Sequence, residues 1–235
     1  MTRDETGTVA PAPDPAPRPG KAELTRQSIV DAAMRLFLAG GYDKTTMRAI
    51  ADEAGVSSGN AYYYFGSKEH LLQAFYDRVQ IEHAAAAEEV LARERAFPAR
   101  LQGLVEAWVD VAEPYHAFAG RFFRTAAEPS SPLSSFSAES AGPRLASTEL
   151  FRQVVEGSDL RLAADLRPQL PELLWLMHMG VVLFWVHDDS PGQQRTRALV
   201  ARAVPLVDKL ARLTRLPVVR GVVKDVVDLV DAIRA

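Results

Sequence analysis

The chain has 235 residues, of which 48% are hydrophobic, and a formal net charge of −3. This length and hydrophobic content allow one sizeable core or two small ones. The sequence contains no cysteine, which excludes disulfides, thiolate metal sites and thiol catalysis. The slight excess of acidic residues argues against a protein that binds nucleic acid mainly through its overall positive charge.

Residues 1–20 form a Pro- and Ala-rich segment without the apolar run of a signal peptide. We predict a disordered tail with no functional site, although Arg18, Lys21 and Arg26 would suit an arm that lies along DNA. With no export signal and no segment long enough to span a membrane, we expect a cytoplasmic protein.

Residues 45–68 carry the capping and turn residues of a helix-turn-helix. The hydroxyl of Thr45 or Thr46 is predicted to cap the first helix, and Gly55 suits the left-handed residue that ends it. Ser57 is predicted to cap the second helix. The turn between the two helices is then about three residues long, as is usual in this motif.

The second helix, over residues 58–65, carries small, amide and phenolic side chains that suit a DNA groove better than a solvated surface. Small residues let the backbone approach the bases, the Asn60 amide can bond a base edge, and tyrosine hydroxyls can bond phosphates. Tyr62 is alternatively part of the core, but at least one of the next two tyrosines must be exposed on a helix. Lys68, which begins the next helix, is predicted to contact a phosphate.

Residues 24–79 resemble the DNA-binding domain of the TetR (tetracycline repressor) family of transcriptional regulators. Besides the motif above, the resemblance includes the GGY bend at residues 40–42 and the FGSK sequence at residues 65–68. Two residues depart from the family pattern, since Ala61 stands where a larger aliphatic residue is usual and Asn60 where threonine is common. These departures bear on local packing and on the operator sequence.

The resemblance implies a role for each matching residue of the motif. Thr46 and the three tyrosines would contact phosphates and sugars, residues 58–60 would face the major groove, Arg48 would reach a base, and Lys68 would clamp a phosphate. Without the resemblance, Arg48 and Lys68 would be ordinary surface charges. The residues predicted to contact DNA are Thr46, Arg48, Ser58, Gly59, Asn60, Tyr62, Tyr63, Tyr64 and Lys68.

Beyond the motif, apolar residues recur at helical spacing with almost no strand-like alternation, so we predict an all-α protein. A three-helix DNA-binding domain is expected over residues 21–70, and the resemblance implies a helical bundle for effector binding and dimerisation over residues 71–235. After the motif, helices are expected over residues 68–91, 101–111, 114–125, 145–156 and 169–187, and a mobile loop is expected over residues 128–142.

The segment 169–187 is apolar on nearly all sides and too short to span a membrane, so it belongs inside a bundle or an interface. His178 at its centre needs a polar partner, which is either another core group or a ligand. A pocket here would prefer a lipophilic or aromatic compound with one polar handle, although aromatic residues at helical spacing more often fill a core. The candidate effector-binding residues are Trp108, Phe122, Trp175, His178 and Phe184.

Two C-terminal segments have apolar residues at alternating spacings of four and three. The first forms a seam that suits a partner helix, with Pro205 expected to kink it, and the resemblance implies pairing with a second subunit here. The second, over residues 218–234, is an extra helix that either covers its own bundle or extends the dimer. The candidate dimer-interface residues are Leu199, Ala203, Leu206, Leu210 and Leu213.

Together, the motif and the resemblance predict a ligand-responsive regulator that acts as a repressor and leaves a palindromic operator when its effector binds. Its expected partners are double-stranded DNA, a second copy of itself and a small molecule. Alternatively, the bundle binds a partner protein or no ligand. An enzyme is disfavoured, because residues 187–189 suit a helix end and cap, and no phosphate-binding glycine loop, nucleophile elbow or zinc motif is present. No cofactor or metal is expected.

Overall fold

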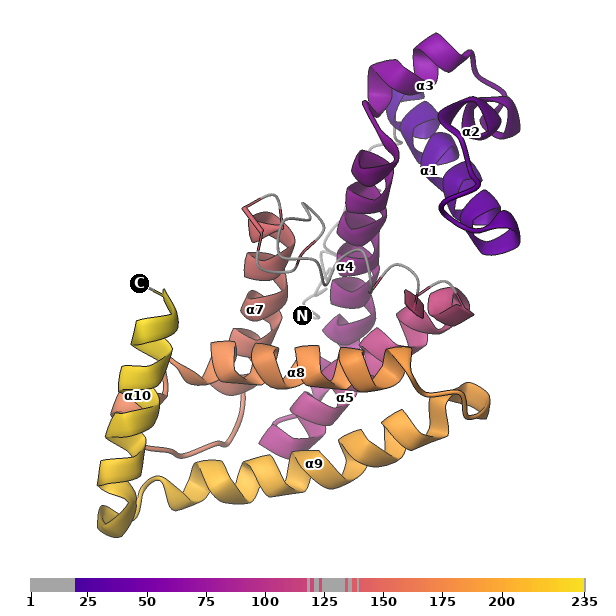
Figure 1. The fold of residues 1–235 in the computed structure, drawn as a ribbon. Coiled ribbons are helices and arrows are strands. Elements are labelled where there is room, and N and C mark those ends of the chain that lie inside the picture. The colour runs from indigo at the N-terminus through magenta and orange to yellow at the C-terminus, as the bar shows by residue number, and fades with distance from the viewer. Residues whose placement is uncertain are drawn as a thin grey trace, which may run out of the picture.

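The protein is all-α, as predicted, and Figure 1 shows a small group of helices, α1–α3, carried at one end of the long helix α4. The computed structural model describes residues 20–117, 119–120, 123, 134, 137–138 and 140–234. Its α-helices are α1 (Lys21–Gly40), α2 (Met47–Ala54), α3 (Ser58–Tyr64), α4 (Lys68–Arg93), α5 (Phe97–Ala112), α7 (Ala141–Glu156), α8 (Leu170–Val186), α9 (Gln194–Leu213) and α10 (Arg220–Arg234). Its 3-10 turns are η1 (Glu113–Tyr115), η2 (Ala164–Leu166), η3 (Pro191–Gln193) and η4 (Pro217–Val219).

The ends of α2 and α3 confirm the predicted caps. The hydroxyl of Thr46 accepts a hydrogen bond from Ala49 N at 3.1 Å, and that of Ser57 accepts one from Asn60 N at 3.1 Å. Gly55 has φ 69° and ψ 30°, the left-handed conformation that a residue without a Cβ adopts most easily. These three residues therefore set where α2 ends and α3 begins.

The neighbouring hydroxyls have other roles. Thr45, the alternative cap, donates to Gly41 O at 2.8 Å and so ties α2 to the end of α1. Ser67 stands at the cap position of α4, but its side chain makes no capping hydrogen bond there. Ser67 therefore occupies a position from which a serine usually caps a helix, without making that bond.

The first core lies between α1, α2, α3 and the N-terminal half of α4. Its buried side chains include Ile29, Phe37, Ile50 and Leu71, and it continues along α4 to Val79. The first half of α4 is thus packed as part of the helix-turn-helix unit, beyond the end expected at residue 70.

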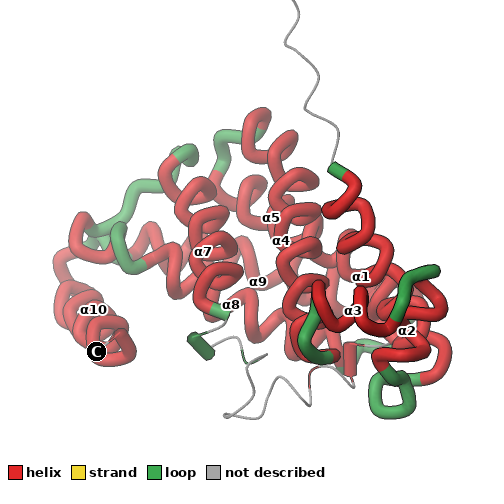
Figure 2. Tube along the Cα trace, turned by 90° about the horizontal axis from the view of Figure 1, so that it is seen from above, coloured by secondary structure: helices red, strands yellow, loops and turns green. Residues whose placement is uncertain are grey.

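The second core is enclosed by the other half of α4 together with α5, α7, α8 and α9. Helix α5 packs against α4, α7 and α9, while α8 packs against α7 and α9. Figures 1 and 2 both place α10 and the α1–α3 unit at opposite ends of the molecule. Because α4 contributes to both cores, one continuous helix links the helix-turn-helix to the bundle.

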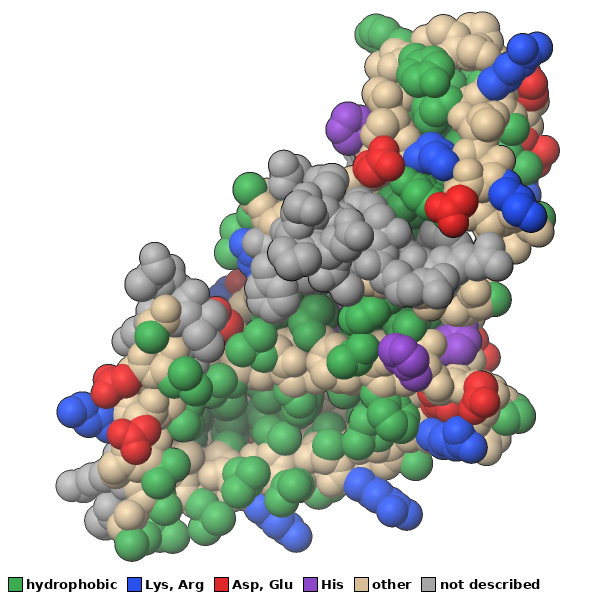
Figure 3. Space-filling model, viewed as in Figure 1, with side chains coloured by type: hydrophobic (Ala, Val, Ile, Leu, Met, Phe, Trp, Pro, Cys, Tyr) green, Lys and Arg blue, Asp and Glu red, His purple; other side chains and the backbone are tan. Residues whose placement is uncertain are grey.

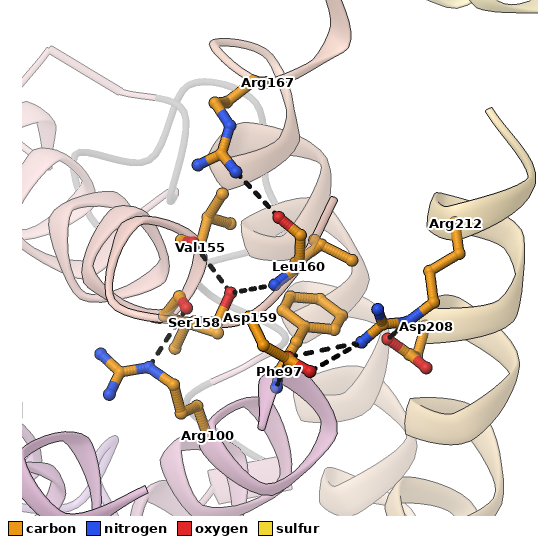
Figure 4. A network of polar contacts seen from close by, with 10 residues as sticks. Phe97, Arg100, Val155, Ser158, Asp159, Leu160, Arg167, Asp208 and Arg212 are labelled. Atoms are coloured by element: carbon orange, nitrogen blue, oxygen red, sulfur yellow. Dashed lines mark hydrogen bonds and ion pairs between the residues drawn. The ribbon is translucent and has the colours of Figure 1, made fainter. Parts of the chain in front are cut away.

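Helix α5 begins at Phe97, four residues before the predicted start. Pro98 occupies its first turn, where the missing N–H of proline costs nothing, and Phe97 N donates to Asp159 Oδ1 at 2.9 Å. Figure 4 shows Asp159 between Phe97 and Arg212, whose guanidinium also bonds this carboxylate. The early start thus follows from a cap supplied by a distant loop.

The region between α5 and α7 differs in part from the prediction. The helix expected over 114–125 begins as the 3-10 turn η1, and α7 begins at Ala141, four residues before its predicted start. Most of the loop predicted over 128–142 lies outside the described residues.

Arg100 of α5 is a buried cation whose hydrogen bonds reach α4 and α7, and Figure 4 shows its position beside the end of α7. Its guanidinium donates to the carbonyl oxygens of Val154, Gln153 and Glu94 at 3.2, 2.6 and 2.8 Å, and to that of Leu91. Burial, with a smaller contribution from a nearby arginine, lowers the pKa of Arg100. Because it satisfies carbonyl groups at the ends of α4 and α7, Arg100 fixes both helix ends against α5.

Helix α9 has two different faces. Val200, Val204 and Ala211 are buried in the second core. The leucines of the seam predicted over 199–213 are exposed, and Figure 3 shows hydrophobic side chains gathered over α8 and α9. Helix α9 continues through Pro205, which lies inside it. The seam is therefore left uncovered by the described part of its own chain.

The predicted extra helix is present as α10. It packs against η2, with Val223 buried and Val219 and Val226 half-buried. Val222 and Leu229 are exposed on its other side. The described valines at the predicted spacing in α10 thus pack against their own chain.

Within the described ranges, no helix combines the length and the apolar composition required to cross a bilayer.

Asp188 supports the start of α9 from the loop that follows α8. Its buried carboxylate accepts from the backbone N and the hydroxyl of Ser190 at 3.0 and 2.6 Å, and from those of Thr196 at 2.8 and 2.7 Å. Burial alone would raise the pKa of Asp188, but these hydrogen bonds outweigh it and lower the pKa to about 2. This geometry agrees with the capping role predicted for this loop.

We predict that Asp188→Asn lowers the free energy of unfolding by about 2 kcal/mol at pH 7, because the depressed pKa reports that much stabilisation of the charged form. The contribution is present above the unfolded-state pKa of about 3.9 and is lost as the pH falls toward the folded-state value. Urea denaturation at pH 7 and pH 2.5 measures it, with the exposed Asp189→Asn as control. An equal loss at both pH values would contradict this account.

Candidate nucleic-acid interface and effector cavity

Helix α3 presents its predicted DNA-contacting residues on the outside of the molecule. Gly59 and Asn60 are exposed, Tyr62 is 54% exposed and Tyr63 is 83% exposed. Ser58, in the first turn, is half-buried. Two adjacent tyrosines with this much free surface are more typical of a binding surface than of a solvated helix.

Tyr64 differs from its two neighbours. It packs against the first core, and its ring lies edge-on to that of Tyr63 with the centroids 5.3 Å apart. The partly buried position that the sequence offered to Tyr62 is therefore occupied by Tyr64. Tyr64 supports the Tyr63 ring while remaining at the edge of the exposed surface.

Lys68, the predicted phosphate clamp, is positioned by Tyr42. Its Nζ donates to Tyr42 O at 2.8 Å and lies 4.4 Å from the centroid of the Tyr42 ring. The Tyr42 hydroxyl donates to Glu69 Oε1 at 2.8 Å. Hydrogen bonds from Ser67 and Tyr42 lower the pKa of Glu69, whereas burial and this carboxylate raise the pKa of Tyr42. The bend before α2 and the start of α4 are thus joined, and the lysine keeps further N–H donors for an external anion.

Two unpaired cations lie near the start of α2. Arg48 and Lys44 are exposed, and within the described residues neither makes an ion pair or a side-chain hydrogen bond. Arg35, by contrast, pairs with Glu53 at 2.9 Å. Sequence reasoning did not select Lys44, although its place just before the capping threonines could have indicated it. These two cations give local positive charge to a chain whose formal net charge is −3.

Gly59 is not required by the packing of its own chain. A Cβ built on Gly59 would have the Ser57 hydroxyl at 4.0 Å as its only neighbour within 4 Å. Glycine weakens a helix relative to alanine, so its position in α3 is costly for the fold. Its missing side chain is useful only to something that approaches from outside.

We predict that Gly59→Ala stabilises the protein by roughly 0.5–1 kcal/mol and weakens its binding to DNA. Chemical denaturation and fluorescence anisotropy with labelled duplex measure the two effects. Gly221→Ala is the matched control, because Gly221 is also the second residue of its helix and has no neighbour for a Cβ within 4 Å. Equal DNA affinity for both variants would count against a close approach at Gly59.

A cavity of about 480 Å³ is lined by residues of α4, α5, α7 and α8, together with Tyr115 of η1 and residues between η1 and α7. Three of the predicted effector-binding residues, Trp108, Trp175 and His178, are in its wall. Phe184 is not a lining residue and is exposed. Leu183 and Trp185 on either side of it do line the cavity, because neighbouring residues of a helix point in different directions. Phe122 lies outside the described residues.

Three buried polar atoms of lining residues have no hydrogen-bond partner in the described structure. They are Gln73 Oε1, His178 Nδ1 and Trp185 Nε1. The His178 ring stacks with that of His83 at a centroid distance of 6.2 Å. Burial, and then the neighbouring His83, lower the pKa of His178 to about 3. This imidazole is therefore neutral at physiological pH.

Sequence reasoning missed the wall that α4 contributes. Gln73, Tyr76 and Gln80 line the cavity from this helix, and Arg144 and Ser147 line it from α7. The spacing of residues 73, 76 and 80 places them on one helical face, where polar side chains interrupt the apolar pattern. Polar residues on this face could have indicated from the sequence that α4 lines a cavity.

Family models match both parts of the chain. The model described as "Tetracyclin repressor-like, C-terminal domain" matches residues 100–233, which is more than half of the chain. The chain belongs to the TetR family of transcriptional regulators. A second model, "Bacterial regulatory proteins, tetR family", matches residues 29–75, so the resemblance of residues 24–79 is confirmed.

Membership of the TetR family places the chain among regulators and not among enzymes. The described ranges also contain no group of three or more His, Asp or Glu residues that could hold a metal ion.

TetR-family relatives match the chain over different lengths. The HTH-type transcriptional regulator SrpR of Pseudomonas putida is 46% identical over 54 residues, which are 23% of this chain and 25% of SrpR. The chain spans 25% to 30% of the length of the first curated relatives that it matches.

Solved TetR-family structures match much more of the chain. The regulator from Nitrosomonas europaea ATCC 19718 has a TM-score of 0.60 at 20% identity, over 78% of this chain and 97% of that one. Thermus thermophilus FadR, solved in complex with lauroyl-CoA, has a TM-score of 0.57 at 19% identity, over 81% and 95%. At such identities the likeness shows the fold alone.

Proposed function

We propose that this TetR-family chain is a cytoplasmic, homodimeric, DNA-binding repressor that leaves a palindromic operator when a small lipophilic or aromatic effector enters the cavity. The observation that carries this proposal is the exposed surface of α3, where an amide, a glycine and two tyrosines face outward together. Such a surface suits the major groove, in which an amide reads a base edge and phenolic hydroxyls bond phosphates.

Operator contacts in this proposal divide into two kinds. Asn60 and Arg48 read bases, while Thr46, Lys68 and the tyrosine hydroxyls bond the backbone and fix the register of α3. Ser58 and Gly59 allow the start of α3 to approach the groove. The motif has few unpaired cations, so we expect modest non-specific binding and a shallow dependence of affinity on salt.

Dimerisation is supported by the exposed leucine seam of α9. Leu206 and Leu210 are 56% and 55% exposed, and Leu199 and Leu213 are exposed beside them. Contiguous apolar surface of this kind marks an interface in a soluble protein. A symmetric pair of chains would hold two copies of α3 about 34 Å apart, the spacing of successive major grooves on one face of DNA.

Ligand response is supported by the position of α4. Gln73, Tyr76 and Gln80 form one wall of the cavity, while Leu71 and Leu72 of the same helix belong to the first core. A ligand that shifts this wall would therefore move the helix-turn-helix unit that packs on it. The effector needs to bind more tightly to a dimer whose helix-turn-helix units are wrongly spaced for the operator. A difference of a few kcal/mol in its binding free energy between the two spacings is enough to release the DNA.

The alternative regulator, with a bundle that binds a protein or no ligand, requires a filled core beneath Trp175 and His178. The cavity at these residues favours the effector proposal. A structural neighbour, T. thermophilus FadR, was solved with lauroyl-CoA, which is consistent with ligand binding on this fold.

Selection of bound sequences from a random duplex library tests the proposed DNA recognition. The full-length protein should enrich an inverted repeat whose half-sites are centred about one helical turn apart. Recovery of no consensus at moderate salt, or of an unrepeated site, would contradict a dimeric operator-binding protein.

A further inference from the structure

We propose that the cavity binds an uncharged aromatic compound carrying both a hydroxyl group and a carbonyl oxygen. This inference rests on the proposed effector function and specifies the ligand that the cavity takes. Three observations carry it: the aromatic walls, the unpaired polar atoms and the distribution of charge.

Several aromatic rings line the cavity. The Trp108 ring lies edge-on to those of Trp185 and His178, each at a centroid distance of 5.0 Å. Trp175 and Phe75 also line the space. Such walls favour a flat ring system, which gains from edge and offset contacts in addition to its burial.

The unpaired atoms specify which polar groups the ligand needs. Trp185 Nε1 is a donor only and requires an acceptor, whereas Gln73 Oε1 is an acceptor and requires a donor. His178 Nδ1 takes either role according to its tautomer. Each atom is buried without a partner in the described structure, and a buried polar atom without a partner is costly. A carbonyl oxygen for the indole and a hydroxyl for the amide oxygen would relieve that cost.

The charges around the cavity favour a neutral ligand. No Asp or Glu is found among its described lining residues, and Arg144 is the only Lys or Arg among them. The Arg144 guanidinium already donates to Ser137 O at 3.2 Å. His178 is neutral, since burial depresses its pKa. Transfer of a carboxylate into this apolar space would therefore be penalised.

Four probes with one diaryl skeleton separate these requirements. 4-Hydroxybenzophenone carries both the hydroxyl and the carbonyl, benzophenone carries the carbonyl alone, and 4-benzylphenol carries the hydroxyl alone. The fourth probe, 4-benzoylbenzoate, carries the carbonyl and a carboxylate. Isothermal titration calorimetry on the full-length protein measures their affinities. The three tryptophans of the chain all line the cavity, so a change in intrinsic fluorescence locates the bound probe there.

We expect 4-hydroxybenzophenone to bind about tenfold more tightly than either single-group probe, and 4-benzoylbenzoate to bind more weakly than benzophenone. Equal affinity for the first three probes, tightest binding of 4-benzoylbenzoate, or binding of none would overturn the proposal.

Two variants identify the atoms that read the ligand. Gln73→Leu should remove the advantage given by the hydroxyl, and Trp185→Phe the advantage given by the carbonyl, each with a loss of about tenfold for 4-hydroxybenzophenone. Gln80→Leu is the matched control, because Gln80 lines the same wall and is not one of the residues with an unpaired buried atom. An equal loss in Gln80→Leu would overturn the assignment.

The titration contains no DNA, so its result is independent of the proposed repressor function. If 4-hydroxybenzophenone binds as expected but leaves operator affinity unchanged, the ligand inference stands and the proposed release mechanism fails. If the protein binds its operator but takes none of the probes, the ligand inference fails and DNA recognition stands.

Discussion

Replacing Leu206 and Leu210 together by glutamate should convert the protein to a monomer and weaken operator binding by at least about a hundredfold. Both leucines are more than half exposed in the single chain, so the substitution should leave its folding intact. In a dimer they would be buried against a partner helix, where two unpaired carboxylates per chain are strongly unfavourable. A single helix-turn-helix covers only half of a palindrome, so loss of the dimer removes half of the DNA contacts.

Sedimentation velocity measures the change in oligomeric state, and fluorescence anisotropy with the selected duplex measures affinity. Lys209→Glu, an exposed substitution on the same helix and outside the leucine seam, is the control for charge alone and should leave the dimer intact. If the double variant remains dimeric with unchanged operator affinity, the leucine seam is not the interface.

Asn60→Ala should lower operator affinity by at least about thirtyfold. A lost base contact costs about 1–3 kcal/mol, and this cost counts twice when both helix-turn-helix units of a dimer bind one operator. The loss should be specific to sequence. Competition with duplexes substituted at single base pairs should show that the variant no longer discriminates at two positions related by the operator symmetry.

Tyr63→Phe provides the contrast. It removes a hydroxyl that we assign to a phosphate, so it should weaken binding to all duplexes by a similar factor and leave the base preference unchanged. Both side chains are exposed, so thermal denaturation should be nearly unaffected. If Asn60→Ala keeps the full base preference of the parent protein, this residue does not read the operator.

Local chemistry made the helix-turn-helix predictable from sequence. Its caps at Thr46 and Ser57 and its turn at Gly55 depend on neighbouring residues and on backbone conformation, which the sequence states directly. The apolar seam of α9 was predictable for the same reason, since it depends on spacing along one helix. These features are also those for which the structure agrees most closely with the prediction.

Side-chain environments that depend on tertiary packing were harder to predict. Tyr62 and Tyr64 could exchange burial without any change in helical pattern, and the hydrogen bond of Lys68 to Tyr42 joins residues 26 positions apart. The early start of α5 likewise depends on Asp159, which no local pattern indicates.

The cavity was the least predictable feature, since its walls come from four helices and from the segment between α5 and α7. Trp108, Trp175 and His178, which the sequence offered as candidates for effector binding, line the cavity, but their aromatic character alone does not distinguish a wall from a filled core. The contribution of Gln73 and Tyr76 appears only once α4 is placed beside α8.

Hydroxyl-radical footprinting of the wild-type protein on its selected duplex tests the central claim most directly. Two α3 helices held by one dimer should protect two patches about 34 Å apart on one face of the DNA, symmetric about the centre of the inverted repeat. A single patch, or protection on opposite faces of the duplex, would contradict a dimeric repressor that reads DNA through α3.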